Sequence, residues 1–172
     1  MEGWVGLDLR DSPDDQFRRG GTCSIAGSSM WAGLTAAEAA GLFWVAGQGY
    51  GNNWDIAIRK TFTYPGSGAV TLQYDFAIDS EPGFDFLFVE IDSTGSGSGP
   101  WVQLELYDGL QGGTVNRPLA PGSEMRTTAG PVTIRFRAFS DGSYSDEDGL
   151  DASTCGHSTL DNIRLGGAIA DT

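Results

Sequence analysis

The stretch "AVTLQYDFAI", residues 69–78, decides the fold class because its apolar and polar side chains alternate without a break. One face would carry Val70, Leu72, Tyr74, Phe76 and Ile78, and the other Thr71, Gln73, Asp75 and Ala77. Alternation with a period of two is typical of a strand that buries one face and exposes the other to water. The stretch therefore predicts a half-buried β-strand.

Other stretches repeat this pattern at short intervals. Residues 56–64 and 131–139 alternate in the same way, and in "WVQLELYD", residues 101–108, Val102, Leu104 and Leu106 would share one face. The stretch "FDFLFVEID", residues 84–92, is apolar on both faces, which indicates a central strand. Because turns rich in glycine and proline separate these stretches, the sequence predicts an all-β, antiparallel sandwich.

Helical structure is expected at one place only. "LTAAEAAGL", residues 34–42, has helix-forming residues and Thr35 as a candidate cap. In the following "GLFWVAG", residues 41–47, both faces are apolar, so Phe43 and Trp44 are predicted to lie in the core. No internal repeat occurs, and we expect residues 1–172 to form one domain with at most this one short helix.

The formal charge of −13 narrows the partners that the chain can bind. This negative charge disfavours binding to nucleic acid or to anionic membrane surfaces, since both usually require contacts from lysine and arginine to phosphates. No apolar run approaches the roughly 18 residues of a membrane helix, so membrane insertion is not expected. The first residues lack the features of a signal peptide, and we expect one to have been removed from a secreted precursor.

Two cysteines lie near opposite ends of the chain, Cys23 and Cys155. They are either bonded to each other or buried as free thiols. Their placement favours a disulfide, because the first and last strands of many β-sandwiches are neighbours. A disulfide would indicate an oxidising compartment, and so a secreted or cell-surface protein.

The motifs of common enzymes are absent from the sequence. His157 is the single histidine, and neither a His-Glu-x-x-His nor a Gly-x-Ser-x-Gly motif occurs. A glycosidase remains an alternative, because such an enzyme needs two acids roughly 5–10 Å apart and the sequence contains many acids. However, the acids lie in glycine-rich loops beside like charges, a setting closer to cation ligation than to an apolar pocket. We therefore expect a non-catalytic protein, with a hydrolase as the less favoured alternative.

Acidic residues gather in two windows, 75–92 and 141–161, which hold 12 of the 23 acids. Ca²⁺ takes six to eight hard oxygen ligands, and carboxylates on flexible loops supply them. An EF-hand is excluded, since the twelfth position from Asp141 is Ala152 instead of glutamate. The alternative is that these acids are simply solvated. The candidate ligands of Ca²⁺ are Asp79, Glu81, Asp85, Asp146 and Asp148.

Four segments together resemble a known family. They are "GYGNNWD" (49–55), "YDFAIDSEPGFDFLFVEID" (74–92), "RFRAFSDGSYSDEDGLD" (135–151) and "STLDNIRL" (158–165). Their order is similar to MAM-like jelly-roll modules of secreted bacterial proteins, including those attached to immune-inhibitor-A-type metallopeptidases. The resemblance implies a two-sheet jelly roll, an extracellular location, a non-catalytic role and a structural cation with Asp161 at the matching position. The four-cysteine pattern of animal MAM domains and any peptidase motif are absent.

Non-catalytic jelly rolls often hold sugars on aromatic rings with amides or carboxylates nearby. The candidate ligand-binding residues are Tyr50, Asn52, Asn53, Trp101 and Tyr144. A core position is expected for the neighbouring Trp54, and turn formation is the alternative role of the two asparagines. The sequence thus predicts a Ca²⁺-stabilised accessory module that binds a polysaccharide, or a cell-surface glycan or protein. The alternative is a structural or adhesive protein that self-associates through sheet edges.

Overall fold

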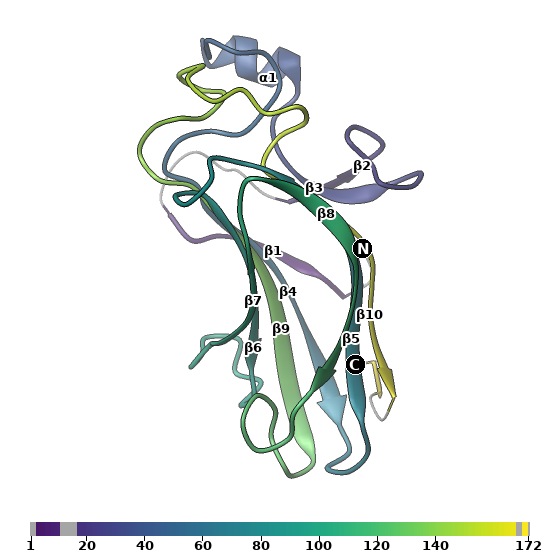
Figure 1. Ribbon diagram of the computed structural model, residues 1–172. Helices are drawn as coiled ribbons and strands as arrows, with labels where there is room; N and C mark the ends of the chain where they lie inside the picture. The colour runs from purple at the N-terminus through teal and green to yellow at the C-terminus, as the bar shows by residue number, and fades with distance from the viewer. Residues whose placement is uncertain (1–2, 11–16, 168–169, 172) are drawn as a thin grey trace.

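The computed structural model describes residues 3–10, 17–167 and 170–171, and Figure 1 shows two β-sheets packed face to face with one short helix. All strand pairs are antiparallel. The first sheet has the order β1 (Val5–Asp8), β4 (Asp55–Tyr64), β9 (Gly130–Phe139), β6 (Phe86–Asp92) and β7 (Val102–Tyr107), and β11 (Ala170–Asp171) also pairs with β4. The second has the order β2 (Arg18–Gly20), β3 (Ser29–Ala32), β10 (Ser158–Gly167), β5 (Val70–Asp79) and β8 (Leu110–Leu119).

The connections between these strands define a jelly roll. Strands β3, β10, β5 and β8 form one layer and β4, β9, β6 and β7 form the other. From β3 to β10 the chain changes layer at every step except from β6 to β7, which pair as a hairpin. This eight-stranded arrangement is the double-sheet jelly roll, and it confirms the predicted fold class.

The core lies between the two sheets, where the alternation of the sequence places it. In β5 the side chains from Val70 to Ile78 that were predicted to face inward are buried, and the intervening ones are not. Strand β6 is flanked by β9 and β7, which confirms its predicted central position. Its side chains that point away from the core include Phe86 and Phe88, so this strand has apolar groups on both faces.

The alternation predicted for β7 is wrong at its end. Leu106 is 43% exposed, whereas the half-buried Tyr107 packs against the core and its hydroxyl lies 2.8 Å from that of Tyr74. The pairing of β7 with β6 shifts between Val89 and Glu90. A β-bulge of this kind reverses the face on which the following side chains lie, and the sequence pattern of one strand does not reveal it.

Helix α1 (Ala36–Gly41) has Thr35 as its N-terminal cap, as predicted. The Thr35 hydroxyl accepts a hydrogen bond from the backbone of Glu38, whose carboxylate accepts one from the Thr35 backbone. Beyond the helix, Trp44 is half-buried against the core, but the prediction for Phe43 is wrong because this ring is 92% exposed. Its backbone is in the left-handed region (φ 63°), which turns the side chain outward.

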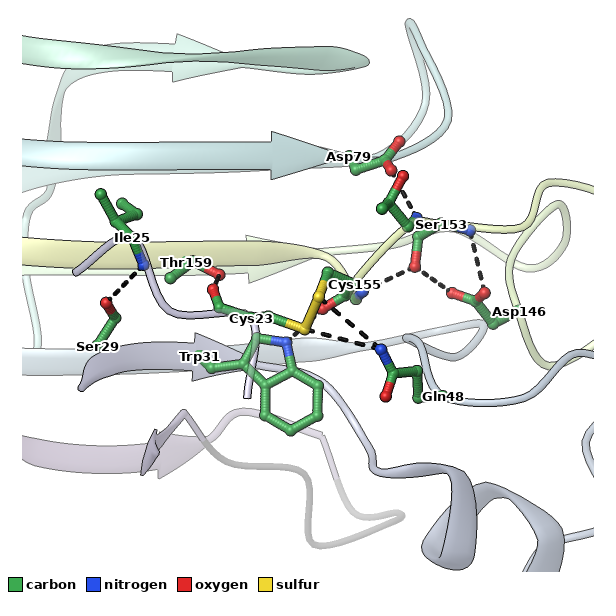
Figure 2. The surroundings of a disulfide bond; sticks show 12 residues. Cys23, Ile25, Ser29, Trp31, Gln48, Asp79, Asp146, Ser153, Cys155 and Thr159 are labelled. Carbon is green, nitrogen blue, oxygen red and sulfur yellow. Dashed lines mark hydrogen bonds between the residues drawn. A yellow bond between two sulfur atoms is a disulfide. The ribbon is translucent and has the colours of Figure 1, made fainter. Parts of the chain in front are cut away.

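A disulfide joins Cys23 to Cys155, which confirms the predicted pairing. Their Cα atoms lie 5.5 Å apart, and the bond links the loop after β2 to the segment that enters β10 (Figure 2). Each neighbourhood is fixed by a further bond: the Trp31 indole donates to the carbonyl of Cys155 at 2.5 Å, and the Thr159 hydroxyl donates to that of Cys23 at 3.0 Å. The disulfide therefore holds the end of the long β9–β10 loop against the second sheet.

Removal of the disulfide should destabilise the protein strongly. The bond closes a loop of 132 residues, and the chain-entropy relation gives a contribution of about 5 kcal/mol to the free energy of unfolding. We expect the double variant Cys23→Ser/Cys155→Ser to show this loss in urea unfolding. Unfolded but unreduced wild-type protein should contain no reactive thiol. An unchanged urea midpoint in the double variant would contradict this role.

Candidate functional site

The acidic loops meet at one end of the sandwich. Strands β5 and β9 both end there, and the β5–β6 loop (80–85) and the β9–β10 loop (140–157) extend from them. In Figure 1 the β9–β10 loop lies beside α1 at the top of the molecule. The segment 45–46 pairs with this loop, since the backbone amides of Val45 and Ala46 donate to the carbonyls of Glu147 and Asp146.

Tyr50 connects the two loops from the inside. Its ring has no exposed surface, and its hydroxyl donates to Asp85 at 2.8 Å and accepts from the backbone amide of Glu81 at 3.1 Å. Its own backbone amide donates to the Asp146 carboxylate at 2.9 Å. Burial raises the pKa of Tyr50 above its ordinary value, so the phenol remains a neutral donor.

Three carboxylates converge beside this tyrosine. One ligand oxygen from each of Glu81, Asp85 and Asp141 lies within 4.8 Å of the others. Asp85 is completely buried, and its second oxygen accepts from the backbone amide of Asp141 at 2.8 Å. We call these three residues the carboxylate cluster.

The carboxylate cluster is electrostatically unfavourable without a cation. Burial, together with the nearby charges of Asp141 and Asp151, raises the pKa of Asp85 to about 6, although two hydrogen bonds oppose the rise. Desolvation and the surrounding carboxylates also raise the pKa of Glu81. Among the described residues, no arginine or lysine forms an ion pair with any of the three acids. A hard cation could therefore bind all three and relieve their repulsion.

Three other predicted ligands lie at the same end of the molecule, where backbone amides and a serine hydroxyl donate hydrogen bonds to them. Asp146 is buried and accepts from the amide and hydroxyl of Ser153, at 3.0 and 2.7 Å. Asp79 accepts from the amide of Thr154 at 2.6 Å. Despite partial desolvation, hydrogen bonds from the loop 144–150 lower the pKa of Asp148. These acids organise the β9–β10 loop.

Asp161, the cation ligand that the family resemblance implies, lies apart from the end loops. It is a residue of β10, opposite Asp75 of β5, and its carboxylate accepts from the Ser29 hydroxyl at 3.1 Å. Asp75 lies four positions before Asp79, the last residue of that strand. Strand geometry thus places Asp161 roughly 13 Å from the acidic end.

Two of the predicted ligand-binding residues have structural positions instead. Tyr50 has no exposed surface, so its ring cannot stack on a sugar, and its predicted role in ligand binding is wrong. Asn53 occupies a turn with φ 61° and accepts from the side chain of Arg10 through its carbonyl. Trp54 is buried, which confirms its predicted core position.

The other three are partly accessible. Asn52 donates to Asp148 at 3.2 Å, and Tyr144 at the same end is 49% exposed. Trp101 is half-buried and lies on the first sheet, with the guanidinium of Arg135 4.0 Å from its ring centre. The structure therefore brings Asn52 and Tyr144 together at Asp148, since the Tyr144 backbone amide also donates to it, and places Trp101 elsewhere.

Sequence reasoning missed two contributors to the acidic end. Asp141 was not among the predicted ligands, although it directly follows the strand that leads to the acidic loop. Gly49 was not singled out, but a Cβ at this position would lie 1.8 Å from the Asp146 carboxyl carbon. The alternation of glycine with polar and aromatic residues in "GYGNNWD" was the available signal for such a close approach.

His157 is a core residue beside this site. It has no exposed surface, and its ring meets that of Tyr50 edge-on with centroids 5.2 Å apart. Burial lowers its pKa to about 4, and Nε2 lies 3.2 Å from the carbonyl oxygen of Phe139. The imidazole is therefore neutral at pH 7.

Comparison with models of known protein families and with curated protein sequences gives no match for this chain. Within the described part of the chain, no helix is long and apolar enough to span a membrane.

The hydroxyl of Tyr50 should matter for stability more than an exposed hydroxyl at the same end. We expect Tyr50→Phe to lower the free energy of unfolding by about 1–3 kcal/mol, because it leaves Oδ2 of buried Asp85 without its donor. Tyr144→Phe is the matched control, with an expected change within about 0.5 kcal/mol. Equal urea midpoints for Tyr50→Phe and wild type would contradict the role of Tyr50 as the connection between the loops.

His157 should make stability depend on acid pH. Its folded pKa of about 4 lies below the unfolded value of 6.5, so its contribution is complete above pH 6.5 and is lost as the pH falls to 4. The raised pKa of Asp85 has the opposite effect, because protonation of this carboxyl favours the folded state as the pH falls through part of this range.

Comparison with His157→Gln isolates the histidine. Between pH 7 and 4, wild type should lose on the order of 3 kcal/mol of unfolding free energy relative to this variant. Parallel pH profiles of the two proteins would show that His157 is not buried in its neutral form.

Proposed function

We propose that this chain is a non-catalytic extracellular accessory module that a structural Ca²⁺ stabilises and that binds a carbohydrate or another cell-surface ligand. The observation that carries the proposal is the carboxylate cluster, in which two separate loops bring three uncompensated acids within 4.8 Å. In this proposal Glu81, Asp85 and Asp141 hold the ion. The ion would cross-link the β5–β6 and β9–β10 loops, and so fix the end of the sandwich.

The donor set fits Ca²⁺ chemistry. All three side chains offer hard oxygen atoms, and the two hydrogen bonds that Asp85 accepts leave further lone pairs on both of its oxygens. Water can complete a Ca²⁺ shell of six to eight oxygens at the exposed side of Glu81 and Asp141. A thiolate or imidazole site is not supported, since both cysteines are bonded and His157 is buried away from solvent.

The disulfide and the jelly-roll topology support the extracellular assignment. A disulfide that closes most of the chain is typical of proteins that fold in an oxidising compartment. The topology is also the one that the resemblance to MAM-like modules implies. Membership in that family is part of this proposal.

Burial of Asp85 favours binding over catalysis. A carboxyl with a pKa of about 6 has the acidity of a general acid, and other acids lie near it. However, a general acid must reach the substrate, and Asp85 has no exposed surface. The arrangement therefore suits an internal ligand of a cation better than a glycosidase.

A second candidate function, adhesion through self-association, is favoured by strand β8. This strand forms one edge of the second sheet over ten residues, and most of its side chains are exposed. Long open edges can pair with a second copy. Light scattering that rises with protein concentration would support this candidate, and a monomer at all concentrations would remove it.

Ca²⁺ should raise the melting temperature, and EDTA should lower it. At a hundredfold excess over the dissociation constant, mass action adds about 2.7 kcal/mol, which corresponds to a shift of about 5–10 °C for a domain of this size. We expect Asp141→Asn to lose most of this shift, because the variant keeps the acceptor for the Ser143 amide but lacks the charge.

Asp161→Asn is the matched control, since Asp161 lies on the second sheet away from the cluster. It should keep the full Ca²⁺-dependent shift. A melting temperature that responds to neither Ca²⁺ nor EDTA would overturn the calcium site. Equal effects of both substitutions would place the ion at another position.

A further inference from the structure

The outer face of the first sheet carries a stripe of arginine and aromatic side chains. Antiparallel pairing sets Phe86 beside Phe139 and Phe88 beside Arg137. The alternate residues of both strands, such as Leu87 and Phe136, are completely buried, so the stripe faces away from the core. We define the outer-face stripe as Phe86, Phe88, Trp101, Arg135, Arg137 and Phe139.

The rings of the stripe are contiguous and partly open to solvent. The ring centroids of Phe86 and Phe88 are 5.7 Å apart, and those of Phe88 and Phe139 are 6.5 Å apart. All three rings are half-buried. Leu106, which the β-bulge turns outward, pairs with Phe88 and extends the apolar surface towards β7.

Carboxylates and rings together fix the two arginines of the stripe. Arg137 donates through Nε and Nη2 to both oxygens of Asp55, at 2.6 and 2.8 Å, and its guanidinium lies 5.1 Å from the ring centre of Phe88. Arg135 bonds Glu90 at 2.7 Å beneath Trp101. Within the described residues, Nη1 of neither arginine makes a hydrogen bond. Each guanidinium therefore holds a donor in a fixed orientation.

Two more arginines lie on the same face without a carboxylate partner among the described residues. The guanidinium of Arg10 lies 5.1 Å from the ring centre of Phe139, and Arg59 pairs in register with Arg135. Four of the chain's nine arginines thus gather on one face of a protein whose net charge is −13. Outer sheet faces are ordinarily polar, whereas arginine with aromatic rings is the composition of binding surfaces.

We propose that the outer-face stripe binds a polyuronate, a polysaccharide with a carboxylate on its sugar units. This inference rests on the carbohydrate-binding part of the proposed function and names its ligand class and surface. Aromatic rings stack on the C–H faces of sugars, and guanidinium N–H groups bind carboxylates with charge-assisted hydrogen bonds.

Charge selects this ligand over other polyanions. The arginines of the stripe are partly neutralised by Asp55 and Glu90, so the face suits a chain of moderate charge that also offers apolar ring surface. The overall charge of −13 opposes every polyanion, and most strongly the denser phosphates of nucleic acids and anionic membranes. Most of the stripe lies on β6 and β9, and Phe86 directly follows Asp85 of the carboxylate cluster.

The test is calorimetric titration of the intact protein with polygalacturonate at low ionic strength in the presence of EDTA. EDTA prevents Ca²⁺ from bridging the polyuronate to the acidic end. We expect binding to polygalacturonate that weakens as salt is added, and none to neutral dextran. Arg10→Gln and Phe88→Ala should each weaken binding about fivefold or more, with folding verified by the melting temperature.

Arg19→Gln is the matched control, since it removes the same charge from β2 of the other sheet. It should bind polygalacturonate as wild type does. The proposal is overturned by absent binding, by equal binding of dextran, by binding that requires Ca²⁺, or by equal effects of Arg10→Gln and Arg19→Gln. The Ca²⁺-dependent melting shift is measured without polysaccharide, so its outcome tests the calcium site separately.

Discussion

The buried carboxylate of Asp85 is the constraint on which the acidic end of the molecule depends. A carboxylate without exposed surface is costly unless donors or a cation compensate its desolvation. The hydroxyl of Tyr50 and the backbone amide of Asp141 supply two donors. Because these groups come from separate segments, satisfying one side chain fixes the segment before β4 and the β9–β10 loop relative to the end of β5.

The same loop is held independently from the opposite side. Asp146 accepts from Tyr50 on one side and from Ser153 on the other, and Ser153 lies two residues before the disulfide at Cys155 (Figure 2). The chain from 146 to 155 is thus fixed at both ends by bonds to residues distant in sequence. A preorganised loop lowers the entropic cost of bringing carboxylates together, which is the condition for a cation site built from separate loops.

The sequence was sufficient to predict burial and strand position where the pattern within one strand determines them. The alternation from Val70 to Ile78 identified a half-buried strand, and the all-apolar stretch that contains Phe86 and Phe88 identified a central one. The sequence pattern failed where the pairing between two strands determines the face on which a side chain lies. The bulge beside Val89 turned Leu106 outward, and no periodicity within β7 carries information about β6.

The sequence predicted where the candidate site lies, but not all of the residues that form it. Clustering of acids indicated the end loops, and the structure places Glu81 and Asp85 together there. Asp141 and Tyr50 joined them through folding of the backbone, for which the residue types give no signal. Asp161 was expected from family resemblance alone, and the register of β10 against β5 places it along the strand instead.

Charge is distributed over this fold in a way that its composition does not suggest. The end loops collect acids without cationic partners, while the outer face of the first sheet collects arginines fixed by rings and single carboxylates. Uncompensated acids in contact attract a small hard cation, since only a compact ion reaches several oxygens at once. Planar guanidinium groups on a sheet instead match an extended anionic chain, because strand geometry spaces them at regular intervals. The two surfaces therefore suit different ligands and need not compete for either.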